Sequence, residues 1–236
     1  MRTGTAESLK RRAAERAAEW IRDGMTVGLG TGSTVRHLLD HIAERRAAGE
    51  WGSIAGVPTS ERTAARAREL GIPLRTLDEA PQVDLTIDGA DEVDPELRLI
   101  KGLGGALLRE KVVATASRRL VIIVDESKMV AKLGTRSPLP VEVDPFGAAI
   151  QPPFLRSLGA EPTLRPGADG APLVTDGGNL IFDCRFSHGI EDPEGLEARL
   201  DGRVGVMENG LFLGLASAVV VAGADGVRTV EREGGR

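Results

Sequence analysis

The sequence predicts an α/β protein with a doubly wound, mostly parallel β-sheet and a smaller α+β domain inserted into it. Short apolar runs alternate with amphipathic helical patterns up to about residue 130, which is typical of parallel strands joined by helical crossovers. After Lys132 the pattern changes, because a glycine and three prolines follow closely around one apolar run. We predict domain boundaries of 1–132 plus 208–236 for the larger domain and 133–207 for the smaller one.

The elements of the larger domain follow from hydrophobic periodicity. Leu9, Ala13 and Ala17 recur at helical spacing, and this first helix is expected to end at Asp23-Gly24. A second helix carries Val35, Leu38, Leu39 and Ile42 on its apolar face. The other predicted helices are 60–70 and 106–116, and the predicted strands are 25–29, 54–57, 83–87 and 120–124.

The smaller domain is predicted from shorter patterns. Its strands are 139–143, 160–164 and 179–183, and its helices are 146–158 and 193–200. Three further strands are predicted at 211–213, 218–221 and 227–230. We expect all three to return to the first sheet, which would make the second domain an insertion.

Composition excludes several classes of protein. The 236 residues carry a net charge of −5, which disfavours nucleic-acid binding through the whole surface. A single cysteine, Cys184, allows no internal disulfide, and its apolar surroundings indicate a buried thiol. No signal peptide is apparent, and the longest apolar tract, 211–224, is short for a bilayer span. We therefore expect a cytoplasmic protein that does not enter a membrane.

A glycine-rich turn after the first strand predicts an anion site. Gly30-Thr31-Gly32-Ser33-Thr34 lies between a strand and a helix, where unpaired N–H groups and the helix dipole attract negative charge. The competing interpretation is that Ser33 or Thr34 is an N-cap. A dinucleotide fingerprint fits poorly, because Ser33 replaces the third glycine and no acid follows the second strand. A methyltransferase turn also fits poorly, because Thr26 stands where an acid is usual. The pattern favours a small phosphate ester.

An acidic turn follows the strand at 83–87. The segment 84–94 holds five acids in eleven residues, and ligands bind at the carboxyl ends of strands in open α/β sheets. These carboxylates could accept hydrogen bonds from sugar hydroxyls or bind Mg²⁺. The nearby Lys101 supplies positive charge directly, so we predict no metal. Glu92 and Asp94 are interpreted as a solvated acidic turn.

A second glycine loop, Lys101-Gly102-Leu103-Gly104-Gly105-Ala106, leads into the helix that carries Arg109-Glu110-Lys111. Glycines allow the loop to wrap a ligand, and Lys101 could neutralise developing negative charge. By position alone, a glutamate such as Glu110 is more often a surface residue or a partner of the helix dipole than a catalytic base.

In this order, these motifs resemble the ribose-5-phosphate isomerase type A family. The resemblance continues through Asp125-Glu126-Ser127-Lys128, the segment 138–143 and Thr175-Asp176-Gly177-Gly178-Asn179, so it covers nearly the whole chain. It implies a Rossmann-like domain with an inserted α+β, ferredoxin-like domain, and a homodimer or homotetramer. It also implies interconversion of ribose 5-phosphate and ribulose 5-phosphate in the pentose phosphate pathway, without a cofactor.

The resemblance also implies roles for individual residues. Glu110 matches the general base that moves a proton between C2 and C1 through an ene-diolate, and Lys101 matches a residue near the reacting oxygens. Asp88 matches an acid that contacts the sugar and assists ring opening. Leu103 departs from the pattern, because many relatives carry glycine there. The remaining substrate-binding residues implied are Thr31, Gly32, Ser33, Thr34, Gly89, Ala90, Asp91, Gly102, Leu103, Gly104, Lys128 and Lys10.

The chemistry fits these residue types. Removal of a proton beside a carbonyl requires a base tuned towards neutral pH and donors for the oxyanion. An unperturbed glutamate has a pKa of about 4.3, so the role requires partial burial to raise it.

Three histidines are given no functional role. His37 and His41 lie four apart on one helix, yet no third ligand is apparent, so they are interpreted as a polar helix face. His188 is expected to face solvent.

Other functions remain open at the level of sequence. A sugar-phosphate deaminase or a CoA-transferase could use a similar sheet. A sensor domain could bind a sugar phosphate without turnover.

Overall fold

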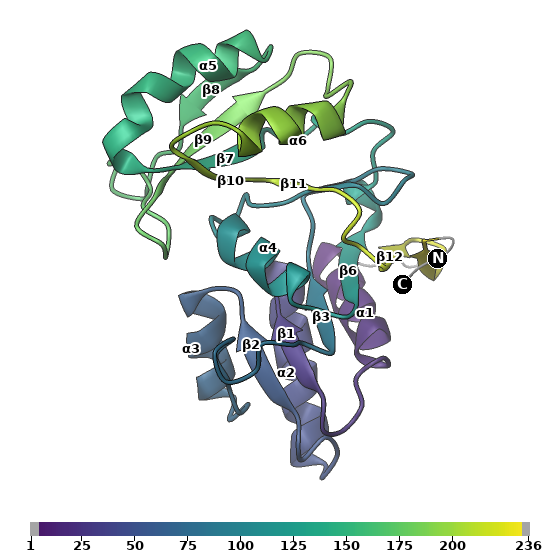
Figure 1. Ribbon diagram of the computed structural model, residues 1–236. Coiled ribbons are helices and arrows are strands. Elements are labelled where there is room, and N and C mark those ends of the chain that lie inside the picture. Colours follow the sequence, from purple (N-terminus) through teal and green to yellow (C-terminus); the bar gives the residue numbers. More distant parts are fainter. Residues whose placement is uncertain (1–4, 233–236) are drawn as a thin grey trace. The chain divides into compact units, whose positions relative to one another are not determined.

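The computed structural model describes residues 5–232, and its chain divides into two compact units (Figure 1). Unit 1 comprises Met1–Ala90, Arg109–Lys128 and Leu215–Arg236. Unit 2 comprises Asp91–Leu108 and Met129–Gly214. Each unit has its own sheet and its own apolar core.

Unit 1 contains a six-stranded sheet in the order β13-β12-β6-β3-β1-β2. Only β13 is antiparallel to its neighbour; the other pairs are parallel. This arrangement confirms the predicted mostly parallel α/β fold. The strands are β1 (Thr26–Leu29), β2 (Ala55–Pro58), β3 (Leu85–Asp88), β6 (Leu120–Asp125), β12 (Ala218–Gly223) and β13 (Gly226–Glu231).

Helices lie on both faces of this sheet (Figure 1). The largest core cluster joins α1 (Ala6–Ala18) and α2 (Ser33–Ala47) to one face. On the other face, Val113 of α4 (Leu107–Thr115) packs against Val57 and Val83. Because both faces are covered, every residue of β1, β3 and β12 is buried. The remaining helix, α3 (Glu61–Glu69), begins after Ser60, whose hydroxyl accepts a hydrogen bond from the Thr63 N–H.

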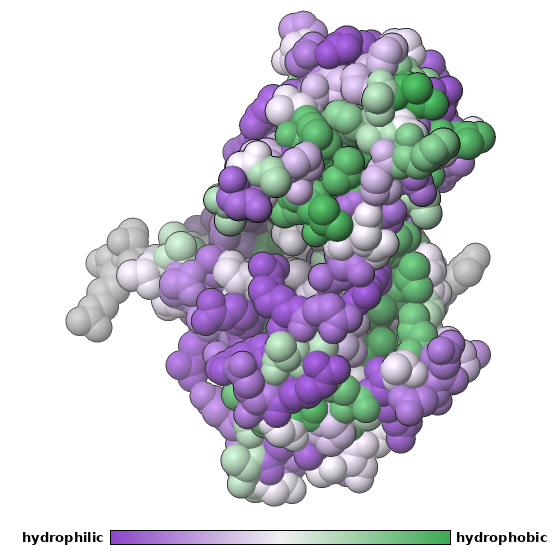
Figure 2. Space-filling model, turned by 90° about the vertical axis from the view of Figure 1, so that its left-hand side faces the viewer, coloured by the Kyte–Doolittle hydropathy of each residue, from purple (hydrophilic) through white to green (hydrophobic). Residues whose placement is uncertain are grey.

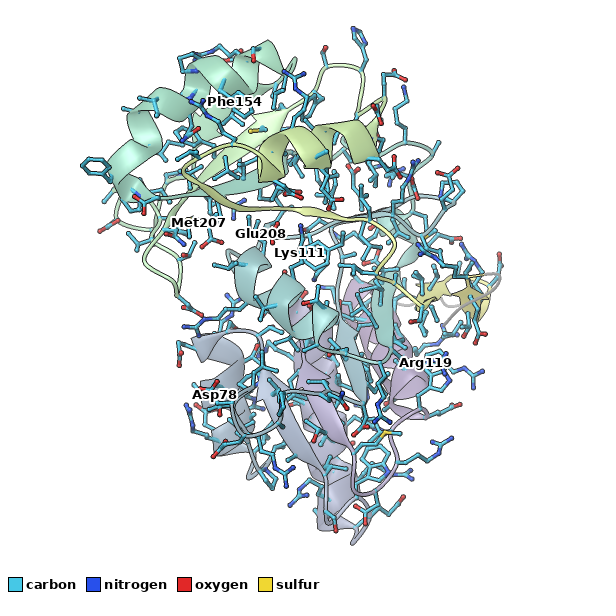
Figure 3. The ribbon with its side chains drawn as sticks, viewed as in Figure 1. Asp78, Lys111, Arg119, Phe154, Met207 and Glu208 are labelled. Carbon is cyan, nitrogen blue, oxygen red and sulfur yellow. The ribbon has the colours of Figure 1, made fainter. Side chains whose placement is uncertain are left out.

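Unit 2 contains an antiparallel sheet in the order β10-β7-β9-β8. Its core lies between this sheet and two helices, α5 (Gln151–Ser157) and α6 (Pro193–Asp201). Arg203 lies over the ring of Phe154 on α5, 4.7 Å from its centroid (Figure 3). The strands are β7 (Leu139–Val143), β8 (Glu161–Leu164), β9 (Leu180–Arg185) and β10 (Val206–Asn209); the short 3-10 helix η2 (Pro145–Ile150) precedes α5.

One predicted strand was assigned to the wrong sheet. The segment 211–213 was expected in the first sheet, but β11 (Leu211–Phe212) pairs with β5 (Leu99–Ile100) in a separate sheet of unit 2. β4 (Glu92–Val93) completes that sheet. The other two tail segments, β12 and β13, do return to the large sheet, as predicted.

Candidate active site

The first glycine turn joins β1 to α2 in unit 1. Gly32 is the N-cap of α2, with φ of 139°, and no side chain caps this helix end. The N-cap interpretation of Ser33 and Thr34 is therefore wrong: Ser33 is the first helical residue and is exposed, and Thr34 is half-buried. The helix start thus retains the backbone N–H groups and positive dipole end that attract an anion.

Asp88, the last residue of β3, fixes this turn. Its side chain is buried, and Oδ1 accepts hydrogen bonds from the N–H of Thr31 (3.0 Å) and of Gly89 (2.7 Å). Gly30 has no room for a side chain, because an added Cβ would lie 2.6 Å from the Asp88 Cα and closer still to its carboxylate. The glycine at position 30 is therefore required by the close approach of Asp88.

A buried hydroxyl cluster lies beneath the same turn. The Thr31 Oγ1 lies 2.8 Å from both Thr59 Oγ1 and Ser60 Oγ, and 3.2 Å from Thr63 Oγ1. Thr63 in turn donates to the Gly30 carbonyl at 2.9 Å. The Thr31 hydroxyl is thus engaged inside unit 1. Thr59, Ser60 and Thr63 were not among the predicted site residues, although they follow β2 at the strand end beside β1.

The other predicted residues of unit 1 lie on separate elements. Glu110 is on α4 and is 3% exposed, and the half-buried Lys111 follows it (Figure 3). Lys128 ends the short helix η1 (Glu126–Lys128) and is half-buried. Lys10, on α1, forms an ion pair with Glu7 at 2.7 Å.

Gly89 and Ala90 follow β3 directly and are half-buried. An added Cβ at Gly89 would lie 4.0 Å from its nearest neighbour, the Ile123 carbonyl oxygen. Position 89 is thus less crowded than position 30.

Unit 2 contains Asp91 and the loop 101–104. Lys101 is 2% exposed, and its ammonium lies 5.3 Å from the centroid of the Phe212 ring, in range of a cation–π interaction. Its N–H donates to the Gly210 carbonyl at 2.9 Å. Asp91 accepts a hydrogen bond from the Leu103 N–H at 3.0 Å, and both Leu103 and Gly104 are exposed. Leucine at position 103 therefore retains a defined backbone contact.

Gly102 turns this loop in a backbone conformation that favours glycine. Its φ is 103°, and an added Cβ would lie 2.8 Å from the Leu107 Cβ. The loop therefore needs glycine at position 102 for both its dihedral angle and its packing.

The prediction of a solvated acidic turn is wrong for Glu92 and Asp94. Both are fully buried. Glu92 accepts hydrogen bonds from three backbone N–H groups, those of Gly134, Arg136 and Ser137. Asp94 accepts from the N–H of residues 96 and 98 and from the Arg98 side chain. These carboxylates are structural acceptors for unit 2.

The histidines and the cysteine have ordinary surroundings. His37 Nε2 lies 2.9 Å from a Glu7 carboxylate oxygen, and His41 meets the Trp51 ring edge-on. His188 is exposed, as predicted. Cys184 is buried, and burial, aided by the nearby Asp183 carboxylate, raises the pKa of its thiol to about 12.

Residues 5–232 contain no group of three or more His, Cys, Asp or Glu side chains that could hold a metal ion. The same residues form no helix that is long and apolar enough to cross a membrane.

Comparison with known proteins assigns the family. The family model for ribose 5-phosphate isomerase A (phosphoriboisomerase A) matches residues 55–226. The chain belongs to the ribose 5-phosphate isomerase A family. The ribose-5-phosphate isomerase A of Roseiflexus castenholzii is 56% identical over 222 residues, covering 94% of each chain. That of Chloroflexus aurantiacus is 54% identical over 230 residues, covering 98% of this chain and 96% of its own.

Solved structures of ribose 5-phosphate isomerases share the fold. The enzyme of Plasmodium falciparum superposes with a TM-score of 0.93 at 38% identity, covering 96% of this chain and 99% of its own. A D-ribose-5-phosphate isomerase in complex with phospho-erythronic acid gives a TM-score of 0.94 at 40% identity, covering 97% and 100%. The predicted fold class and family are both confirmed.

Proposed function

We propose that this chain interconverts D-ribose 5-phosphate and D-ribulose 5-phosphate through an ene-diolate, as a step of the pentose phosphate pathway. The observation that carries the proposal is a buried glutamate, Glu110, in a chain 56% identical to a ribose-5-phosphate isomerase A over 94% of its length. Sugar phosphate isomers of this kind differ only in the positions of two protons, so no cofactor has to supply or accept electrons.

Glu110 acts in this proposal as the single base. It takes the proton from C2 of the open-chain aldose, which gives the ene-diolate with its negative charge on the C1 oxygen. The C2 hydroxyl passes its proton to the C1 oxygen, and the same carboxyl group returns its own proton to C1, which leaves the ketone at C2. Because Glu110 is 3% exposed, the carried proton is shielded from bulk water during the transfer.

Three charged residues, Lys101, Asp88 and Asp91, act on the sugar end of the substrate. Lys101 stabilises negative charge on the ene-diolate oxygens, a role that favours a buried ammonium because electrostatic interactions are stronger away from water. Asp88 assists opening of the sugar ring, and Asp91 accepts hydrogen bonds from sugar hydroxyls. The backbone of Gly89, Ala90 and the loop 101–104 also contacts the sugar. Asp88 lies at the carboxyl end of a parallel strand, where ligands bind in open α/β sheets.

The phosphate is bound by the glycine turn. The backbone N–H groups at the start of α2 and the hydroxyls of Ser33 and Thr34 supply donors, and Lys128 and Lys10 supply positive charge. Thr31 contributes by organising the turn from below, because its hydroxyl lies within 2.8 Å of those of Thr59 and Ser60. Holding the remote phosphate positions the reacting carbons.

The ligand of a similar enzyme supports this chemistry. The relative 40% identical to this chain was solved with phospho-erythronic acid. That compound joins a phosphate to a planar, anionic carboxylate, which is similar in charge and shape to one end of an ene-diolate. Compounds that mimic a transition state bind more tightly than substrates, so it is a suitable inhibitor for this chain.

We further propose a cytoplasmic homodimer or homotetramer assembled through unit 2. The single cysteine is a free, buried thiol, which suits a reducing compartment. Phe146, Ile150 and Val204 of unit 2 are large exposed hydrophobic residues. Figure 2 shows hydrophobic residues gathered in the upper part of one face. The Gln151 side chain donates to the Val204 carbonyl, so these segments adjoin. Apolar patches of this kind often mark protein interfaces.

A coupled assay tests the proposed reaction. Purified protein in excess chelator should convert ribose 5-phosphate to ribulose 5-phosphate at the rate seen without chelator. A loss of activity restored by Mg²⁺ would contradict a metal-free reaction. Ammonia release from glucosamine 6-phosphate would favour a deaminase, and acyl-CoA exchange a CoA-transferase. Binding of ribose 5-phosphate without any product would favour a sensor domain.

A further inference from the structure

Arg165 of unit 2 is a buried charged residue that the reaction described above does not use. It follows β8, and its side chain is 9% exposed. Its backbone is fixed on both sides, because its N–H donates to the Ile181 carbonyl and its carbonyl accepts from the Leu173 N–H, each at 2.9 Å. A guanidinium is costly to bury unless it is paired and its N–H groups are satisfied.

Asp183 on β9 pairs with one edge of this guanidinium. Arg165 Nε donates to Asp183 Oδ2 at 2.9 Å, and Nη2 donates to Oδ1. This is a two-point contact between a planar guanidinium and a carboxylate, which fixes the orientation of the guanidinium plane. Because Asp183 belongs to β9, this pairing also fixes the direction in which the remaining nitrogen of the guanidinium, Nη1, points.

The Nη1 nitrogen of Arg165 binds the loop 101–104. Arg165 Nη1 donates to the carbonyl of Gly102 at 2.9 Å and to that of Leu103 at 3.2 Å. The peptide between Gly102 and Leu103 is consequently held at both edges, because its N–H donates to Asp91. One arginine thus connects the rigid sheet of unit 2 to two successive peptides of the loop.

The orientation of the next peptide follows from these contacts. In a trans peptide the N–H points opposite to the C=O, and residues 5–232 contain no cis peptide bond. Since the Leu103 carbonyl faces Arg165, the Gly104 N–H is directed away from it. Within the described part of the chain, the structure shows no hydrogen-bond acceptor for the Gly104 N–H. An oriented, available donor of this kind is suited to a substrate oxygen.

We infer that Arg165, backed by Asp183, is a positioning residue for the isomerase reaction. It holds the backbone of residues 102–104 so that the Gly104 N–H and the adjoining Lys101 are preorganised for the sugar end of the substrate. The inference rests on the proposed function, because it presupposes that this loop contacts the substrate. It assigns Arg165 no contact with the substrate.

Kinetics of Arg165→Ala and Arg165→Lys in the full-length protein test the inference. We expect kcat for ribose 5-phosphate to fall about 100-fold in Arg165→Ala, the effect of a displacement of roughly 1 Å in a catalytic group. KM should rise less than about threefold, because the residues proposed to bind the substrate phosphate lie outside the loop that Arg165 holds. Arg165→Lys should recover only part of kcat, since one ammonium cannot reproduce the planar fork. Added guanidinium should raise kcat of Arg165→Ala at least several-fold.

Inhibitor binding separates positioning from general loss of structure. In Arg165→Ala, the inhibition constant of phospho-erythronic acid should rise far more than that of inorganic phosphate, which lacks the sugar end. Arg98→Ala is the matched control, because Arg98 also pairs with a buried acid of unit 2, Asp94, and its other ion-pair partners, Glu96 and Glu194, lie outside the loop. It should lower the unfolding temperature and leave kcat within twofold of wild type.

The outcomes distinguish two failures. An active wild type together with wild-type kcat in Arg165→Ala would overturn the positioning role and leave the proposed function intact. Equal weakening of both inhibitors would also overturn it, as would a comparable loss of kcat in Arg98→Ala. A wild type that does not isomerise ribose 5-phosphate would overturn both proposals. If Arg165→Ala does not fold, Asp183→Asn keeps the volume and should show the same pattern, and its wild-type kcat would overturn the inference.

Discussion

Gly30→Ala perturbs the glycine turn with a single methyl group. The added Cβ would lie 2.6 Å from the Asp88 Cα and within the carboxylate's own space. An ordinary carbon–carbon contact is about 3.5–4.0 Å, so β3 or the turn has to move by about 1 Å. Because one of the clashing atoms is backbone, rotation of the Asp88 side chain alone does not relieve the contact.

The free-energy cost follows from two terms. Overpacking of a close-packed site costs about 1–3 kcal/mol. Displacement of Asp88 also weakens the hydrogen bonds that it accepts from Thr31 and Gly89, and a hydrogen bond to a charged group is worth about 1.5–3 kcal/mol. We expect the free energy of unfolding to fall by about 3 kcal/mol. A shift of about 1 Å should also lower kcat/KM about 100-fold.

Urea unfolding followed by tryptophan fluorescence measures the stability term. Both tryptophans, Trp20 and Trp51, pack against the core of unit 1, so the signal reports on the unit that contains Gly30. The coupled isomerase assay measures the activity term. Gly52→Ala is the control, because an added Cβ there meets no atom within 4 Å. Wild-type stability and activity in Gly30→Ala would refute the close approach of Asp88 to the turn.

Two further predictions concern buried groups of unit 2. Glu92→Gln should lower the free energy of unfolding by about 3 kcal/mol, because one carboxylate oxygen becomes an NH₂ that faces a backbone N–H. Unfolding followed by far-UV circular dichroism measures this loss. The control, Glu161→Gln at an exposed position, should change the free energy of unfolding by less than about 1 kcal/mol. Cys184 should resist iodoacetamide in native protein at pH 8 and react fully in urea, because a thiol whose pKa is about 12 stays protonated there. Rapid alkylation of the native protein would contradict the burial of Cys184.

Local patterns predicted most of the fold of unit 1. β6 and β12 are short apolar runs that end at an acid or a glycine, and hydrophobic patterns locate such runs well. β4 and β5 were not predicted, because strands of two residues have no measurable period. β11 was assigned to the wrong sheet because an apolar run does not identify its pairing partner. That partner, β5, lies more than a hundred residues earlier in the sequence.

The candidate site was predictable where glycines and acids follow strands, and less so where contacts are distant in sequence. Glu92 appeared solvated because its three N–H donors come from residues 134–137. The hydroxyl cluster of Thr59, Ser60 and Thr63 could have been found by comparing the ends of adjacent strands β1 and β2. Arg165 carries no sequence signal, since its role depends on Asp183 and a loop about 60 residues away.

The proposed chemistry depends most directly on the carboxylate of residue 110. Turnover of ribose 5-phosphate by Glu110→Gln, measured beside binding of the sugar phosphate to the same sample, separates catalysis from recognition. We expect kcat to fall about 1,000-fold, within the range typical for loss of a general base, while binding and folding are retained; Glu44→Gln, at an exposed position of α2, should behave as wild type. Activity of Glu110→Gln close to that of the wild type would show that another group moves the proton.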